Sequence, residues 1–251
     1  MRRGPALRWS GLTGPLLAWA LFFWLVSAQE LWRRSLTRLF PNVSTPIYER
    51  GTLLDLTGQH LALVGLTMGL VVVVGVGLGV WATRRAGLAF LPLVNNLTTA
   101  GQTFPPIAVL VLALPLLGFG QKAAVTALFA YALLPVTRGV ILGLQSVPAE
   151  VQDAAQGLGL SERQRLTRLE WPAALPSTLA GIRTALVLTV ATAALAPLVA
   201  VGGLGVPIIA GLGSDNLALI LQGAVPVALL ALLCEWTLRV VERVLTPWTA
   251  R

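Results

Sequence analysis

Residues 56–83 read LTGQHLALVGLTMGLVVVVGVGLGVWAT and contain no Asp, Glu, Lys or Arg. A second uncharged run extends from residue 86 to residue 121. Each run is longer than the ~20 residues that cross the hydrocarbon core of a bilayer as a helix. The composition of the 251-residue chain agrees, since 56% of the residues are hydrophobic and 11% are charged, which does not suit a soluble domain. We therefore predict an integral membrane protein.

Six apolar segments predict an all-α integral membrane bundle of about six transmembrane helices. A helix is the expected spanning element because it satisfies its own backbone hydrogen bonds in lipid. The predicted spans are residues 12–28, 58–83, 88–117, 123–140, 182–201 and 217–238. Prolines inside several segments predict bent or broken helices.

The distribution of arginine predicts that both termini are cytoplasmic, because short cytoplasmic loops collect Lys and Arg. Only Arg33, Arg34, Arg38, Arg50 and Lys122 then face outward. The net charge of +8 reflects this topology, since the arginines are scattered among loops and form no nucleic-acid patch. The residues that lie in or near the cytoplasm are Arg2, Arg3, Arg8, Arg84, Arg85, Arg138, Arg163, Arg165, Arg168, Arg183, Arg239, Arg243 and Arg251.

The first apolar segment allows two interpretations. Arginines precede an apolar core at residues 16–26, and Val26-Ser27-Ala28 suits a signal-peptide cleavage site. The alternative is a retained transmembrane helix, which we favour, although the arginines just after it weaken the charge asymmetry that would anchor it.

The sequence offers little for catalysis. His60 is the only histidine and Cys234 the only cysteine, so no cluster is available to hold a metal ion. We interpret His60 as a solvated histidine at a membrane boundary, near Asp55, and Cys234 as a small core residue. Lys122 lies in GFGQKA, which lacks the pattern of a phosphate-binding loop. We predict no catalytic residue, metal or cofactor in this chain.

Ion-coupled transport within the chain is also disfavoured, because it usually requires carboxylates or histidines inside the membrane. Glu235 is the nearest candidate. Its i,i+4 spacing to Arg239, with Glu242 close by, favours an interfacial charge cluster instead.

Two glycine pairs lie within the spans, and there are two breaks, one at residues 102–106 inside the third span and one at residues 202–205 after the fifth. Pairs at residues 65/69 and 75/79 have the small-xxx-small spacing that lets helices approach closely. Polar residues and two prolines at 102–106 must free backbone carbonyls, which is tolerated beside protein or water. Either the two breaks line a translocation path, or they are a simple helix join and a plain loop. The predicted path residues are Gln102, Thr103, Phe104, Pro105, Gly202 and Gly203.

The segment 148–176, PAEVQDAAQGLGLSERQRLTRLEWPAALP, predicts a polar helical hairpin between apolar spans. Its first helix carries an apolar face at i, i+3, i+4 and i+7 and ends at Gly157 and Gly159. Ser161 and Gln164 form a capping-box signature that begins a second helix, which we expect to end before Pro172. The hairpin either docks a partner or rests on lipid headgroups. The apolar face comprises Val151, Ala154, Ala155 and Leu158.

At these residues the chain resembles the permease subunits of binding-protein-dependent ABC importers. Their cytoplasmic loop carries EAA, three residues, Gly, nine residues and Ile-x-Leu-Pro. The chain matches this spacing with Asp153-Ala154-Ala155, Gly159 and Leu169-Glu170-Trp171-Pro172. It departs by Asp for Glu, Leu for Ile and the bulkier Trp for Leu. The segments QTFPPIAVL, LPLLGFG, YALLPVTRG, GLGLSERQRL, LAGIRTA and VGGLG extend the resemblance to the osmoprotectant branch, most like the Yeh-type betaine permeases.

The resemblance implies a MetI-like permease that imports glycine betaine, carnitine or choline across the plasma (inner) membrane of a bacterium or archaeon. Its implied partners are a second permease subunit, identical or paralogous, cytoplasmic ABC ATPase subunits that bind ATP and Mg²⁺, and an extracytoplasmic substrate-binding protein. Residues 1–53 would form an amino-terminal transmembrane helix and external loop, and residues 54–247 the permease domain, with a coupling loop at 146–176. The implied ATPase-coupling residues are Asp153, Ala154, Ala155, Gly159, Leu169 and Pro172.

Other functions remain open at this point. A permease of the same type for an amino acid or another small solute has the same features, since substrate choice resides largely in the binding protein. A membrane-embedded enzyme would need converging polar groups, which the sequence does not offer. A membrane scaffold would use the hairpin to bind an unrelated protein and would not respond to ATP.

Overall fold

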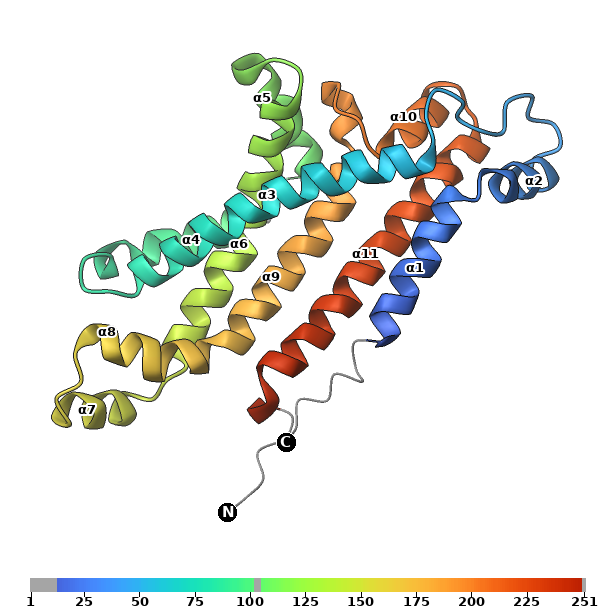
Figure 1. The fold of residues 1–251 in the computed structure, drawn as a ribbon. Coiled ribbons are helices and arrows are strands. Elements are labelled where there is room, and N and C mark those ends of the chain that lie inside the picture. The colour runs from blue at the N-terminus through green and yellow to red at the C-terminus, as the bar shows by residue number, and fades with distance from the viewer. Residues whose placement is uncertain (1–12, 102–104, 250–251) are drawn as a thin grey trace.

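The computed structural model describes residues 13–101 and 105–249, and every regular element within them is helical (Figure 1). This confirms the predicted all-α class. The elements are α1 (Thr13–Ser27), α2 (Gln29–Leu39), α3 (Leu53–Ala82), η2 (Leu88–Phe90), α4 (Leu91–Gly101), α5 (Pro106–Leu117), α6 (Gln121–Gln145), α7 (Ala149–Gly157), α8 (Glu162–Arg165), η3 (Leu166–Glu170), α9 (Trp171–Ala193), η4 (Ala196–Val199), α10 (Gly205–Gly213), α11 (Leu217–Leu245) and η5 (Pro247–Thr249).

Among the described residues, four long helical segments have the length and composition to cross a membrane. They are α3, α6, the continuous stretch from Glu162 to Ala193, and α11. Together α1 and α2 pass the same test, but they are bent by 68° with respect to one another. α1 lies within the first predicted span. It packs on α11, where the Trp19 indole donates a hydrogen bond to Thr237 Oγ1 (3.0 Å).

The third predicted span, residues 88–117, is not one helix in the structure. It is divided into η2, α4 and α5, and both α4 and α5 are too short to count as full-length spans. Pro105 adopts an extended conformation (φ −60°, ψ 132°) and caps α5, which begins at Pro106. Proline cannot donate a helical backbone hydrogen bond and restricts the residue before it, so the two adjacent prolines separate the helices. The predicted path residues Gln102, Thr103 and Phe104 lie outside the described residues.

The fifth predicted span, residues 182–201, was placed too late in the chain. The membrane helix α9 begins at Trp171 and ends at Ala193. Pro172 is its second residue and follows η3 (Leu166–Glu170). After α9 the chain forms the short η4, and Ala200 turns it with a left-handed conformation (φ 62°).

Close glycine contacts hold the centre of the bundle together. Gly139 of α6 faces Gly181 of α9, and a Cβ at Gly181 would lie 2.5 Å from the Pro135 carbonyl oxygen. On α3, Gly75 and Gly79 pack against Val136 and Val140 of α6, as the small-xxx-small spacing predicts. The other predicted pair, Gly65 and Gly69, has no neighbour within 4 Å of a built Cβ among the described residues.

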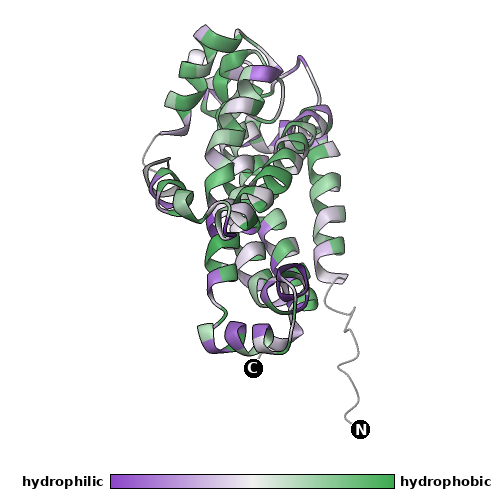
Figure 2. Ribbon diagram, turned by 90° about the vertical axis from the view of Figure 1, so that its left-hand side faces the viewer, coloured by the Kyte–Doolittle hydropathy of each residue, from purple (hydrophilic) through white to green (hydrophobic). Residues whose placement is uncertain are grey.

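The predicted hairpin protrudes at one end of the bundle, which we call the hairpin end. The start of α1 and the end of α11 lie at this end, whereas α2, α10 and the start of α11 lie at the opposite end, which we call the far end (Figure 1). Hydrophilic residues gather at the hairpin end, and the helices above it are mainly hydrophobic (Figure 2). α3 crosses the bundle obliquely and packs on α6 and α9.

Candidate functional site

The first half of the hairpin is α7, and local backbone conformation defines where this helix begins and ends. Pro148 caps it in an extended conformation, and Gly159 turns the chain with a left-handed φ of 78°. The Leu160 amide donates to the Ala155 carbonyl at 3.1 Å and closes this turn. The left-handed conformation favours glycine because glycine has no Cβ.

The predicted apolar face of α7 is largely uncovered. Ala155 is buried, but Val151 is 42% exposed and Leu158 is 81% exposed. The neighbouring residues Asp153 and Ala154 are exposed as well. Exposed apolar side chains next to polar ones on a protruding helix are typical of a protein or membrane contact. Of the residues predicted to couple to an ATPase, Asp153, Ala154 and Gly159 are thus exposed, whereas Ala155 is buried.

The second half of the hairpin begins as predicted but does not end before Pro172. Ser161 Oγ accepts from the Gln164 amide at 3.3 Å, and Gln164 Oε1 accepts from the Ser161 amide at 2.9 Å, which confirms the capping box. The helix then passes through η3, a π-helical segment, directly into α9. The Pro172 ring would otherwise press on the carbonyl of Arg168, and the wider π turn just before it relieves this contact. Leu169 and Pro172 are half-buried in this continuous stretch.

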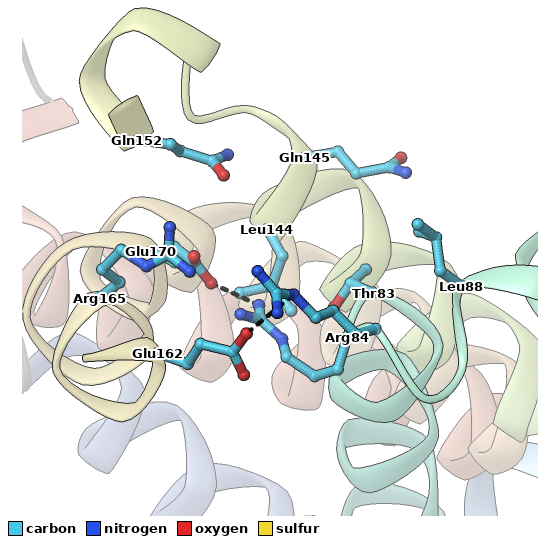
Figure 3. A pocket seen from close by; sticks show the side chains of 10 residues that line it. Thr83, Arg84, Leu88, Leu144, Gln145, Gln152, Glu162, Arg165 and Glu170 are labelled. Carbon is cyan, nitrogen blue, oxygen red and sulfur yellow. Dashed lines mark hydrogen bonds and ion pairs between the residues drawn. The ribbon is translucent and has the colours of Figure 1, made fainter. Parts of the chain in front are cut away.

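Two ion pairs join the hairpin to the turn that follows α3. Arg84 pairs with Glu170, whose side chain is only 5% exposed, and Arg85 Nε lies 3.2 Å from Glu162 Oε1. They border a cavity of about 220 Å³ that Arg165 also lines. In Figure 3, Arg84 and Glu170 point toward one another from the turn after α3 and from the end of η3. The predicted site residues do not include these two side chains, although a carboxylate inside the apolar Leu169-Glu170-Trp171 stretch indicates that a partner is needed.

At the far end, the predicted path residues Gly202 and Gly203 pack on α3. A Cβ at Gly202 would overlap Gln59 Oε1, and Gly203 has a positive φ of 135° beside the His60 ring. In the loop that follows η4, which we call the glycine loop, the positive φ favours glycine at residue 203, and a Cβ at residue 202 would require the Gln59 side chain to move. Pro105 caps α5, and α5 contacts η4 just before this loop. The two predicted breaks thus belong to neighbouring elements.

The interpretation of His60 as a solvated interfacial residue was wrong. His60 is fully buried between α3 and α9, and its Nε2 donates to the Val190 carbonyl at 3.0 Å. Its Nδ1 atom has no partner among the described residues. α3 begins five residues earlier than the predicted span, because Thr52 caps it by accepting from the Asp55 amide at 3.0 Å, and His60 is therefore inside the bundle. The Asp55 carboxylate accepts a hydrogen bond from the Thr52 hydroxyl.

The two carboxylates near the end of α11 have structural partners. Glu235 pairs with Arg239, as the i,i+4 spacing predicts, but Glu242 pairs with Arg183 of α9 at 2.8 Å. Cys234 is buried in the core of α11. Within residues 13–101 and 105–249, His, Cys, Asp and Glu side chains form no group of three or more that could hold a metal ion.

The hairpin and the long helices that flank it lie within a region that is similar to a known protein family. Residues 75–247 match the family of binding-protein-dependent transport system inner membrane components. The chain belongs to this family. It is therefore a multi-pass membrane subunit of a transport system and not an enzyme. The family match begins within α3 and includes the hairpin, the far-end glycine loop and α11.

Curated relatives of this transport component are similar over most of their length. The osmoprotectant import permease protein OsmW of Salmonella typhimurium is 39% identical over 78% of this chain and 93% of the relative. OsmY of the same organism, also an osmoprotectant import permease protein, is 36% identical over 93% of both chains. The glycine betaine/carnitine/choline transport system permease protein OpuCB of Bacillus subtilis is 35% identical over 78% of this chain and 90% of the relative.

Solved structures share the fold. A chain of the MetNI methionine ABC transporter in an inward-facing conformation superposes with a TM-score of 0.66. It is 23% identical over 75% of this chain and 93% of that chain. A second crystal form of the same transporter gives a TM-score of 0.67 at 22% identity. The MetI-like expectation for the bundle is thus confirmed at the level of the fold.

Proposed function

We propose that the chain is the permease subunit of an ATP-driven importer for glycine betaine or a related quaternary ammonium osmoprotectant. The relatives named for osmoprotectant, glycine betaine, carnitine and choline transport support the substrate class. In this proposal two permease subunits form the path through the membrane. An external binding protein delivers the solute, and separate ATPase subunits bind ATP and Mg²⁺ and supply the energy.

The observation that carries the proposal is the uncovered face of α7 on a hairpin that is continuous with a membrane helix. Val151 and Leu158 offer apolar contact area to a groove on a cytoplasmic partner, and Asp153 and Ala154 lie beside them. Because η3 joins the hairpin to α9 without a loop, a partner that moves α7 also moves a membrane helix. Leu169 and Pro172 lie in this connection, and Gly159 shapes the turn at its tip.

The proposal places the hairpin end in the cytoplasm. The arginines of α2 then lie on the outer side, and the start of α1 and the end of α11 lie inside (Figure 1). Solute would pass near the glycine loop at residues 202–203 and the break at 102–105. Residues 54–247 form the transporting unit, and the helices before them pack on α3 and α11 and add contact with lipid.

Reconstitution tests the proposal. The chain is assembled in liposomes with its candidate ATPase and binding protein, and ATP-dependent glycine betaine uptake is measured for wild type, Leu158→Asp and Glu150→Gln. Leu158 is so exposed that its replacement removes a docking contact without disturbing the core, and Glu150 is an exposed control on the same helix. We expect uptake in wild type and Glu150→Gln, and loss of uptake in Leu158→Asp.

The outcomes separate the two parts of the proposal. Uptake in all three proteins would remove the coupling role of α7. If the assembled wild type hydrolyses ATP but imports no quaternary ammonium compound, the substrate class is wrong, and amino acids and other small solutes are screened next. A scaffold predicts no ATP-dependent flux of any solute.

A further inference from the structure

We propose that the Arg84–Glu170 ion pair is the link through which the hairpin moves α3, and that α3 carries this movement to the glycine loop at the far end. Arg84 and Glu170 are positioning residues in this scheme, since they touch neither solute nor nucleotide. The inference rests on the proposed function, because it assigns the route of a coupling that the hairpin begins.

The first step is the position of the pair where the hairpin meets α9. Glu170 is the last residue of η3, the π-helical segment between the hairpin and α9. π-helical segments interrupt the regular hydrogen-bond ladder and are frequent at functional sites. Glu170 is held there by Arg84, from the turn that follows α3, and not by a cation of α9. A movement of the hairpin therefore acts on α3 as well as on α9.

The second step is that the ion pair adds to an apolar contact between the hairpin and α3. In this contact Val76 and Val80 of α3 pack with Leu166 and Trp171 around a small apolar cluster. Glu170 is 4% exposed, so its charge is poorly screened by water and its attraction to Arg84 is strong. The second pair, Arg85 with Glu162, has side chains that are 85% and 54% exposed. Exposed pairs contribute little, so the buried pair is the firm connection between the hairpin and α3.

The third step is the reach of α3. This helix is continuous from Leu53 to Ala82, and at 1.5 Å per residue about 33 Å separate His60 from Ala82 along its axis, with Arg84 in the turn that follows. At the far end, Gln59 contacts the loop at Gly202, and His60 is hydrogen-bonded to Val190 of α9. A tilt of α3 that begins at Arg84 therefore shifts the contact with the glycine loop. Among the described residues, the buried Nδ1 of His60 at this contact has no hydrogen-bond partner, and a second arrangement of the helices can supply one.

The test uses the complete reconstituted complex and measures solute uptake per ATP hydrolysed. Arg84→Gln and Glu170→Gln each break the pair, and the exchange Arg84→Glu with Glu170→Arg restores it with the charges reversed. Arg85→Gln and Glu162→Gln are matched controls in the same turn and the same hairpin. We expect uptake per ATP to fall about tenfold in the single variants, within the usual range of coupling between sites, and to recover in the exchange. The controls should retain the wild-type ratio.

A second measurement does not depend on the solute. Gly58 is exposed on α3 near the far end and has no neighbour within 4 Å of a built Cβ, so Gly58→Cys in a Cys234→Ala background gives an unstrained probe there. We expect a membrane-impermeant maleimide to label it at different rates with and without ATP, and this difference to vanish in Glu170→Gln but not in Glu162→Gln.

Each outcome decides the inference. Unchanged uptake per ATP and unchanged ATP-dependent labelling in Glu170→Gln would overturn it. If Glu170→Gln does not assemble, the exchange variant decides, because an assembled but uncoupled exchange also overturns the inference. Failure of the wild type to import betaine would refute the proposed substrate and leave the labelling test intact.

Discussion

Replacement of Gly181 by Ala tests the helix crossing that holds the hairpin in place. The hairpin connects α6 to α9, and these two helices meet where Gly139 faces Gly181. A Cβ at residue 181 would lie 2.5 Å from the Pro135 carbonyl oxygen, and ordinary contact begins at 3.4 Å, so the overlap is 3.4 − 2.5 = 0.9 Å. Both atoms belong to rigid helices, and the helices must separate to relieve the overlap.

The magnitude follows from two opposing effects. Overpacking of a well-packed contact costs about 1–3 kcal/mol, whereas Ala gains about 1 kcal/mol over Gly in helix propensity. Gly69→Ala is the matched control, because Gly69 lies in a helix interior with no neighbour within 4 Å among the described residues. Both variants gain the same propensity, so it cancels in their comparison. We expect Gly181→Ala to be about 1–3 kcal/mol less stable than Gly69→Ala.

The assay is unfolding of the purified protein in detergent micelles by titration with SDS, followed by tryptophan fluorescence. Wild type and the two variants are compared under identical lipid and detergent conditions. Equal stability of Gly181→Ala and Gly69→Ala would refute the close crossing of α6 and α9. Gly139→Ala added to Gly181→Ala should cost less than the sum of the single changes, because one separation of the helices relieves both overlaps.

Three further changes probe other parts of the structure. Asn216→Ala removes a cap that accepts from the first turn of α11 and a donor to a loop carbonyl at 2.8 Å, so we expect about 1–2 kcal/mol of destabilisation in the same SDS titration. Arg183→Gln leaves the half-buried Glu242 unpaired and should lower stability by about 1–3 kcal/mol, and adding Glu242→Gln should restore most of it; no recovery would show that the pair is unimportant. Gly202→Ala overlaps the Gln59 side chain and should reduce solute uptake, and Gln59→Ala should rescue it; uptake that stays low in the double variant would point to the loop conformation instead.

The parts of this structure that depend on neighbouring residues in the sequence were predictable. The capping box at Ser161 and Gln164 and the glycine turn at Gly159 formed where the pattern indicated, because each is a local exchange of backbone hydrogen bonds. Long apolar runs likewise indicated membrane helices, since hydropathy depends on composition alone. The two prolines at 105–106 carried a signal for a break, but the apolar residues on either side favoured one long span.

The parts that depend on tertiary contacts were not predictable from sequence. The environment of His60 is set by α9, more than a hundred residues away, so polarity alone suggested a solvated site. Pro172 suggested a helix end, yet a π-helical turn before it keeps the helix continuous. Arg84 and Glu170 are 86 residues apart, and only the packing of α3 on the hairpin brings them together.

The two ends of the bundle use different contacts, and this difference suits the proposed coupling. Near the hairpin end, charged pairs such as Arg84–Glu170 and Arg183–Glu242 join separate elements, and a partly buried charge resists separation because it would lose its partner without regaining full hydration. At the far end, the contact of Gly202 with Gln59 is a fit of neutral surfaces that can part and close again at little electrostatic cost. A movement of α7 would therefore be transmitted through the charged pairs near the hairpin end. The weaker contact between Gly202 and Gln59 at the far end would separate first. The far-end loop should open before the hairpin detaches from α3.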